Sequence, residues 1–229
     1  MIAIDNLWKT YPGATALHGI SMRVDEGRVL GVLGENGSGK STLFKVLAGV
    51  TRASEGTVLI DGMEIGRETR RVVSYLPEVS PFYEWMRVGE QLDFVAAFYP
   101  DWQPEKATEL LQLMRLETDR KVGALSDGQR ARLKVVAAFA RPSAVVLMDE
   151  PLGRIDPPSR KRIIEALLRE YRMGEQTILI STHLVDDVEE LIEDVVFLRQ
   201  GEIALSGNSD ELRSERSQSL SDMFEEVVS

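Results

Sequence analysis

The pattern of hydrophobic and polar positions predicts short strands in the first third of the chain. Apolar and polar residues alternate over residues 1–30, as in strands that bury one face. Dipeptides containing glycine or proline mark the turns between such strands. The predicted turns are Pro12-Gly13, Glu26-Gly27 and Asp61-Gly62, the last within a hairpin over 56–65, and a further strand is predicted over 71–76.

From residue 78 to about residue 124 the strand pattern disappears. Residues 88–99 and 104–116 each place apolar side chains on one helical stripe, which predicts two amphipathic helices. We interpret this stretch as a helical insertion. An aromatic cluster at residues 81–86 opens it, and such side chains either form subdomain core or, if exposed, make a docking patch.

From residue 144 the pattern is that of alternating strands and helices. The apolar run over 144–148 is typical of a strand buried on both faces in a parallel sheet. The later predicted elements are a helix over 157–172 (with Ile163, Ile164, Leu167, Leu168 and Tyr171 facing inward), a strand over 177–181, a helix over 184–192, strands near 195–199 and 202–205, and a closing amphipathic helix over 219–228. We expect the closing helix to pack on its own domain, with a partner protein as the alternative.

Composition limits the class of protein. The chain has 229 residues, a net charge of −10 and no cysteine. Its length suffices for one large domain, the acidic balance argues against non-specific nucleic-acid binding, and thiol chemistry is excluded. The N-terminus does not resemble a signal peptide and no apolar run could cross a bilayer, so we expect a cytoplasmic protein that needs a partner for any membrane role.

Residues 34–41, Gly-Glu-Asn-Gly-Ser-Gly-Lys-Ser, match the P-loop pattern between a predicted strand over 29–33 and a predicted helix over 42–50. The glycines let successive N–H groups point at one anion, and the helix adds its positive end. A glycine-rich turn that binds nothing would explain neither the lysine nor the serine. We therefore predict a nucleoside triphosphate site. Its expected residues are Asn36, Gly37, Ser38, Gly39, Lys40 for the β/γ-phosphates, and Ser41 for Mg²⁺.

Two acidic residues follow the predicted buried strand over 144–148. A P-loop enzyme needs a carboxylate near Mg²⁺ and a group that orients water. Asp149 is expected to reach the Mg²⁺ through water, and Glu150 to accept a proton from the attacking water. The alternative is a strand that merely ends in surface acids.

Residues 125–129, Leu-Ser-Asp-Gly-Gln, carry two compatible interpretations. Ser126 and Gln129 form a capping box that would start a helix over 127–140, and a capped helix N-terminus is also an anion site. Here the chain resembles the ABC ATPase family, whose signature is Leu-Ser-Gly-Gly-Gln. The order of P-loop, helical insertion, signature and Asp-Glu-Pro also agrees, over nearly the whole length.

The resemblance implies an α/β fold: a P-loop NTPase core with a mostly parallel sheet, an N-terminal antiparallel β subdomain and a helical subdomain insertion. It implies one ABC ATPase domain over 1–229, with the core and β subdomain in 1–77 and 144–229 and the helical subdomain in 78–143.

The resemblance also assigns roles around the chain's own nucleotide. Tyr11 would stack on adenine, although it could instead be a half-buried turn tyrosine. Thr42 would join Lys40 and Ser41 at the phosphates and Mg²⁺. His183 would contact the γ-phosphate as a switch histidine.

Other roles implied by the resemblance cross between subunits. Ser126 and Gly128, with Gln129, would reach the γ-phosphate of ATP bound in a second ATPase subunit, paired head to tail. Asp156 would lie at the dimer interface, or cap the 157–172 helix ahead of Pro157, or do both. Binding of ATP would close the pair, and hydrolysis with product release would open it.

Three positions depart from the family pattern. Asp127 replaces the first glycine of the signature pair and puts a carboxylate near phosphate. Glu78 stands where most members have glutamine; it remains a Mg²⁺ ligand candidate, and the Leu-Pro-Glu form is similar to ATPases of ABC-2-type exporters. Residues 152–155, Leu-Gly-Arg-Ile, replace the usual Thr-Ser-Ala-Leu, so the interface serine is lost.

The first functional hypothesis is therefore an ATP-hydrolysing subunit that powers export through a separate integral membrane permease, bound near Glu78 and the 81–86 cluster. Its expected place is the inner face of the cell membrane, and no nucleic-acid partner is expected. The alternatives are a soluble ABC-type translation factor, a DNA-repair or chromosome ATPase, and a catalytically weakened half of a heterodimer. The cargo is not specified by this sequence.

Overall fold

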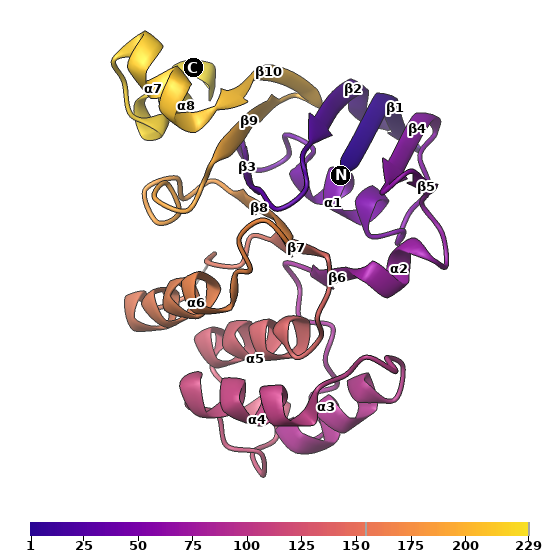
Figure 1. Ribbon diagram of the computed structural model, residues 1–229, viewed down its shortest axis with the longest axis vertical. Helices are drawn as coiled ribbons and strands as arrows, with labels where there is room; N and C mark the ends of the chain where they lie inside the picture. Colours follow the sequence, from indigo (N-terminus) through magenta and orange to yellow (C-terminus); the bar gives the residue numbers. More distant parts are fainter. Residues whose placement is uncertain (154, 229) are drawn as a thin grey trace.

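The computed structural model describes residues 1–153 and 155–228, and it contains two β-sheets (Figure 1). The smaller sheet is antiparallel, with strand order β2-β1-β4-β5. Its strands are β1 (Ile2–Tyr11), β2 (Ala14–Val24), β4 (Glu55–Ile60) and β5 (Met63–Glu64). The first predicted strands therefore form an N-terminal antiparallel sheet, as expected.

The larger sheet has the order β10-β9-β3-β8-β7-β6 and is parallel except for β10. Its strands are β3 (Val29–Leu33), β6 (Val73–Leu76), β7 (Val145–Asp149), β8 (Thr177–Thr182), β9 (Asp194–Arg199) and β10 (Glu202–Asn208). The carboxyl ends of its parallel strands meet at one edge, where ligands bind in open α/β sheets.

The helices lie around these sheets, and α3, α4 and α5 gather at the end away from the antiparallel sheet (Figure 1). These three helices fall between β6 and β7 in the chain, which confirms the predicted helical insertion. The helices are α1 (Lys40–Leu47), α2 (Thr69–Val72), α3 (Val88–Ala96), α4 (Pro104–Leu113), α5 (Asp127–Phe139), α6 (Pro157–Glu170), α7 (Ser209–Arg216) and α8 (Leu220–Val228), with a 3-10 turn at Val122–Ala124. Within the described residues no helix is both long and apolar enough to span a membrane.

Two hydrophobic clusters cover the two faces of the larger sheet, because successive strand residues point to opposite faces. In β8, Leu179 joins the cluster made with the antiparallel sheet and α1. Its neighbours Ile178 and Ile180 join the cluster made with α5, α6 and α8. Burial on both faces explains the apolar runs within β3, β7 and β8, which cover residues 29–33, 145–148 and 178–180.

The predicted helix over 184–192 is wrong, since these residues form consecutive turns between β8 and β9. Side chains take the backbone groups at both ends: Leu184 N–H donates to Thr182 Oγ1, and Ile192 O accepts from Ser209 Oγ. The helical apolar spacing comes from residues that are buried without a helix. They are Val185, Val188 and Ile192.

The structure differs from the sequence-based predictions at three further points: the start of one strand, one unpredicted helix and the orientation of one side chain. The predicted strand over 71–76 begins at Val73, because the two residues before it end α2. Helix α7 was not predicted, and its start is fixed by Asn208 Oδ1, which accepts from two backbone N–H groups of the helix. Leu168 was expected inside but is 61% exposed on α6.

The structure decides two packing alternatives. In the closing helix α8, Leu220 and Met223 are fully buried in the core of this chain, so α8 packs on its own domain. In the 81–86 cluster, Tyr83 and Trp85 are 47% and 67% exposed, so the cluster is not subdomain core as a whole. Within residues 81–86, only Phe82 packs against the hydrophobic cluster that contains α5, α6 and α8.

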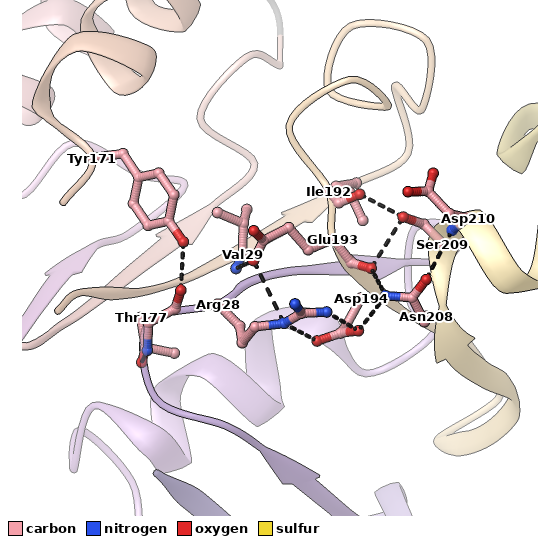
Figure 2. A network of polar contacts seen from close by, with 11 residues as sticks. Arg28, Val29, Tyr171, Thr177, Ile192, Glu193, Asp194, Asn208, Ser209 and Asp210 are labelled. Atoms are coloured by element: carbon pink, nitrogen blue, oxygen red, sulfur yellow. Dashed lines mark hydrogen bonds and ion pairs between the residues drawn. The ribbon is translucent and has the colours of Figure 1, made fainter. Parts of the chain in front are cut away.

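Figure 2 shows a polar network at the amino ends of β3 and β9, opposite the edge where the strands' carboxyl ends meet. The Arg28 guanidinium donates two hydrogen bonds to Asp194, of 2.9 and 2.8 Å. The carboxylate in turn raises the pKa of Arg28. Asn208 Nδ2 donates to Glu193 O and to Asp194 Oδ1, at 3.0 and 3.3 Å. The network therefore ties the start of α7 to the central strands.

We expect the Asp194→Ala substitution to lower the free energy of unfolding by about 1–2 kcal/mol, because it removes a bidentate, charge-assisted contact. Urea denaturation measures this. The control is Glu165→Ala, whose carboxylate lies 3.9 Å from the exposed Lys161, with an expected cost below about 0.5 kcal/mol. Equal costs for the two variants would show that the network does not stabilise the fold.

Candidate nucleotide site

The P-loop, residues 34–41, joins β3 to α1 and is shaped by its glycines. Gly37 and Gly39 have φ angles of +87° and +108°, which favour glycine. A Cβ atom on Gly34 would lie 2.4 Å from the carbonyl oxygen of Leu198. Helix α1 begins at Lys40 without a capping side chain, so its first N–H groups are free to bind an anion.

Lys40 is held in the loop at the position expected of a phosphate ligand. Its side chain is 4% exposed, and its Nζ donates to the carbonyl oxygens of Gly34 and Glu35, at 2.6 and 3.0 Å. The same Nζ lies 3.2 Å from Glu150 Oε1. The positive charge is therefore concentrated beside the loop and already paired with the candidate base.

Asp149, the last residue of β7, accepts hydrogen bonds from three side chains. Ser41 Oγ and Ser181 Oγ donate to its Oδ1, at 3.0 and 2.7 Å. Tyr75 OH donates to its Oδ2 at 3.3 Å. Burial, the Asp149 charge and this hydrogen bond together raise the pKa of Tyr75, so its hydroxyl stays a donor.

Glu150 is fixed in an unusual backbone conformation. Its φ is +47°, which costs a non-glycine residue energy and is common at functional sites. Its N–H donates to Ser181 Oγ at 3.1 Å, and its Oε2 lies 3.0 Å from His183 Nδ1. Glu150 is thus not a loose surface acid, since Lys40 at the start of α1 holds it from one side, and Ser181 and His183 at the end of β8 from the other.

A cavity of about 370 Å³ lies against the P-loop and brings most of the predicted nucleotide residues together. Its lining includes Glu78 as well as Glu150, so the departure at position 78 faces the same space. The lining residues are Ala16, Asn36, Gly37, Gly39, Lys40, Ser41, Thr42, Glu78 and Glu150. Ser38 is buried beneath the loop rather than in this lining.

Oxygen atoms from Ser41, Asp149 and Glu78 are of the kind that Mg²⁺ prefers. Ser41 and Asp149 are already in contact, and Glu78 is exposed at the cavity. No group of three or more acidic or histidine side chains could hold a metal by itself in residues 1–153 and 155–228. A Mg²⁺ ion here would take its other ligands from phosphate and water, as this ion commonly does.

Tyr11 lies at the end of β1 and is 38% exposed. Lys9 Nζ sits 4.8 Å from the centre of its ring. The ring is therefore open to solvent on part of its surface and does not line the P-loop cavity. The stacking of Tyr11 on adenine stays a prediction.

The signature residues, at the start of α5, do not line the P-loop cavity, but Asp127 lines a neighbouring cleft together with Asn36, Glu150 and His183. The capping box is present: Gln129 N–H donates to Ser126 Oγ, and Ser126 N–H donates to Gln129 Oε1. Gly128 packs so closely on α6 that an added Cβ would lie 2.5 Å from Asp156 Oδ1. The side chain of Asp127 is 75% exposed and 3.7 Å from Arg130.

Asp156 caps α6. It accepts from Ser159 N–H at 3.0 Å and from Ser159 Oγ at 2.8 Å, and these hydrogen bonds lower the pKa of its carboxyl. The capping alternative is thereby confirmed, while a role between subunits stays a prediction. In the 152–155 segment, Leu152 and Ile155 are buried, and Arg154 lies outside the described residues.

Sequence reasoning missed Ser181 and Tyr75, which contact Asp149 directly. Ser181 lies opposite Asp149 in the parallel register of β7 and β8, and Tyr75 pairs with Leu147 on the other side of β7. Their polar groups within apolar strands were a visible clue, but only the strand order identifies their partner.

The sequence comparisons agree with this geometry. The family model described as ABC transporter matches residues 17–153. The ABC transporter ATP-binding protein YtrB of Bacillus subtilis is 30% identical over 217 residues, which cover 94% of this chain and 74% of the relative. The linearmycin resistance ATP-binding protein LnrL of the same organism is 30% identical over 223 residues, or 93% and 71% of the two chains.

Solved structures share the whole fold. One, described as the ATP binding subunit of an ABC transporter, has a TM-score of 0.87 and 26% identity, with full coverage of both chains. The ATP-binding cassette MJ0796, described as dimeric and bound to ADP and Pi, has a TM-score of 0.82 at 23% identity, over 91% of this chain and 98% of that one. The chain therefore belongs to the ABC transporter family, as an ATP-binding and ATP-hydrolysing subunit that energises transport.

Proposed function

We propose that the subunit works in a head-to-tail pair, in which one chain's P-loop and the other chain's signature segment enclose Mg²⁺ and ATP. The supporting observation is the separation of the two half-sites: Ser126, Gly128 and Asp156 do not line the P-loop cavity of their own chain. Ser126 and Asp156 are exposed, so a second subunit can reach them. The dimeric description of MJ0796 agrees with this arrangement.

Within that pair, each polar residue has a distinct task. Lys40 binds the β/γ-phosphates, and Ser41, Asp149 and Glu78 hold the Mg²⁺, whose charge offsets that of the phosphates. Glu150 accepts the proton of the attacking water. His183, 3.0 Å from Glu150, orients this base and senses the γ-phosphate.

A separate permease is the proposed membrane partner. An apolar groove of about 400 Å³ runs between the larger sheet and α3, close to the exposed 81–86 cluster. Exposed aromatic rings such as Phe94 and Phe98 line it, and surfaces of this kind are typical of protein docking sites. We assign the groove to a cytoplasmic segment of the permease.

Export is the proposed direction of transport, with the complex at the cytoplasmic face of the cell membrane. The Leu76-Pro77-Glu78 form supports it, as does similarity to a protein named for linearmycin resistance. The cargo is set by the permease and not by this chain.

The Glu150→Gln variant is expected to lower ATP turnover by about 10²–10⁴-fold, because an amide cannot accept the proton. The variant should accumulate as an ATP-bound dimer, which size-exclusion chromatography detects. Glu165→Gln, on the surface of α6, serves as the control. A Glu150→Gln chain that binds ATP yet stays monomeric contradicts the paired mechanism for a homodimer.

Replacement of Asp127 by glycine is expected to raise ATP turnover about two- to fivefold, because it removes a carboxylate that faces the partner's triphosphate. Steady-state hydrolysis assays measure the effect. Asp127→Asn separates charge from backbone freedom and should act in the same direction. Unchanged or lower turnover in both variants would count against this effect of the Asp127 carboxylate.

A further inference from the structure

Lys134, in the middle of α5, is a buried lysine that the nucleotide site does not explain. It is 7% exposed, and its Nζ donates to the carbonyl oxygens of Pro77 and Glu78, at 2.6 and 2.9 Å. Desolvation lowers its pKa, and the nearby charges of Asp149 and Glu78 oppose that effect. Burying an ammonium group costs free energy of desolvation, and the two hydrogen bonds to the loop after β6 offset part of that cost.

Lys134 makes the first of three contacts between this part of the chain and residues 71–78. Lys134 and Ala138 lie one helical turn apart on α5, and Arg141 follows the end of the helix. Ala138 O accepts from Ser74 Oγ at 3.2 Å. The Arg141 guanidinium donates to the carbonyl oxygens of Arg71 and Val73, at 2.5 and 3.5 Å. The partners run from the loop after β6 back through this strand to the end of α2. Lys134 makes the contact with Glu78, which lines the P-loop cavity.

The position of Lys134 links two hollows of the molecule. It lines the docking groove, and it also lines a cleft of about 430 Å³ whose lining includes Glu78, Asp127 and Glu150. The same helix begins at the signature segment, only two turns away from Lys134. Lys134 is therefore part of the lining of both the groove and the cleft.

We propose that Lys134 is a positioning residue that clamps the Glu78 loop to α5, so that Glu78 and the signature segment shift together. The inference rests on the proposed roles of Glu78 and of the signature segment. Lys134 does not contact the nucleotide itself. It acts through the backbone of residues 77 and 78, which sets where the Glu78 carboxylate lies.

The first test measures ATP affinity of the full chain by calorimetry, with Mg²⁺ and with EDTA. Lys134→Met should weaken binding about fivefold in Mg²⁺ and less than about twofold in EDTA, because only the metal-dependent part needs Glu78. Lys134→Arg should restore most of the loss. Equal losses under both conditions, or no loss, would overturn the proposal.

A double-mutant cycle then asks whether Lys134 acts through Glu78. Glu78→Ala combined with Lys134→Met should bind Mg²⁺ and ATP no more weakly than Glu78→Ala alone. Multiplied losses would mean that Lys134 acts by another route. Lys161→Met, at an exposed position of α6, is the matched control and should leave both affinities unchanged.

Amide hydrogen exchange without nucleotide tests the clamp separately from the metal role. Lys134→Met, with Lys134→Gln beside it as a second variant, should speed exchange at residues 78–80 about tenfold, and Lys161→Met should not. If Glu78→Ala leaves the Mg²⁺ dependence of ATP affinity unchanged, the proposed metal role of Glu78 is wrong. The exchange measurement still shows whether Lys134 holds the Glu78 loop against α5. Unchanged exchange in both Lys134 variants overturns the inference.

Discussion

The parallel register of β3, β8 and β7 is the constraint on which the site depends. It sets Leu33 beside Thr182 and Asp149 beside Ser181. Asp149 is the last residue of β7, and the P-loop, Glu150 and His183 follow directly after the strands, so the register brings these groups together. A slip of one residue would turn the polar ends toward the wrong face, and burial of both faces of these strands opposes such a slip.

The register also brings together charges that the fold must then stabilise. Lys40 and Glu150 are both nearly buried, and removing one partner of a buried ion pair typically costs about 3–5 kcal/mol. The carbonyl oxygens of the P-loop share the ammonium charge, and His183 shares the carboxylate. A triphosphate entering the cavity would compete with Glu150 for Lys40, which makes the position of the base sensitive to the nucleotide.

Much of this arrangement could be predicted from local sequence, because local rules determine it. The P-loop needs glycines at positive φ, the capping box needs Ser126 and Gln129 three residues apart, and buried strands need apolar runs. The turns over 184–192 show the limit of such rules. Their apolar spacing is that of a helix, but side chains such as that of Ser209 bind backbone groups of this segment, and periodicity carries no information about such partners.

The contacts of Asp149 mark a second limit. Ser181 and Tyr75 belong to the two strands that flank β7, and strand order is a property of the whole sheet. Lys134 is similar, since a lysine within an apolar helix can as easily extend to solvent as bind a buried loop. The sequence therefore shows these polar residues, but their roles could not be predicted from it, because each role depends on a partner in another element.

Helix α5 connects these constraints. Its first turn packs on the capped end of α6, where Gly128 leaves no room for a side chain, and Lys134 joins it to the loop after β6. A rotation of the helical insertion against the sheet would have to be accommodated at these two contacts. Both lie beside residues proposed to meet ATP, one in each subunit of the pair. Nucleotide binding would therefore change the contacts that resist this motion, which is how the proposed clamp would couple the signature segment to the chain's own site.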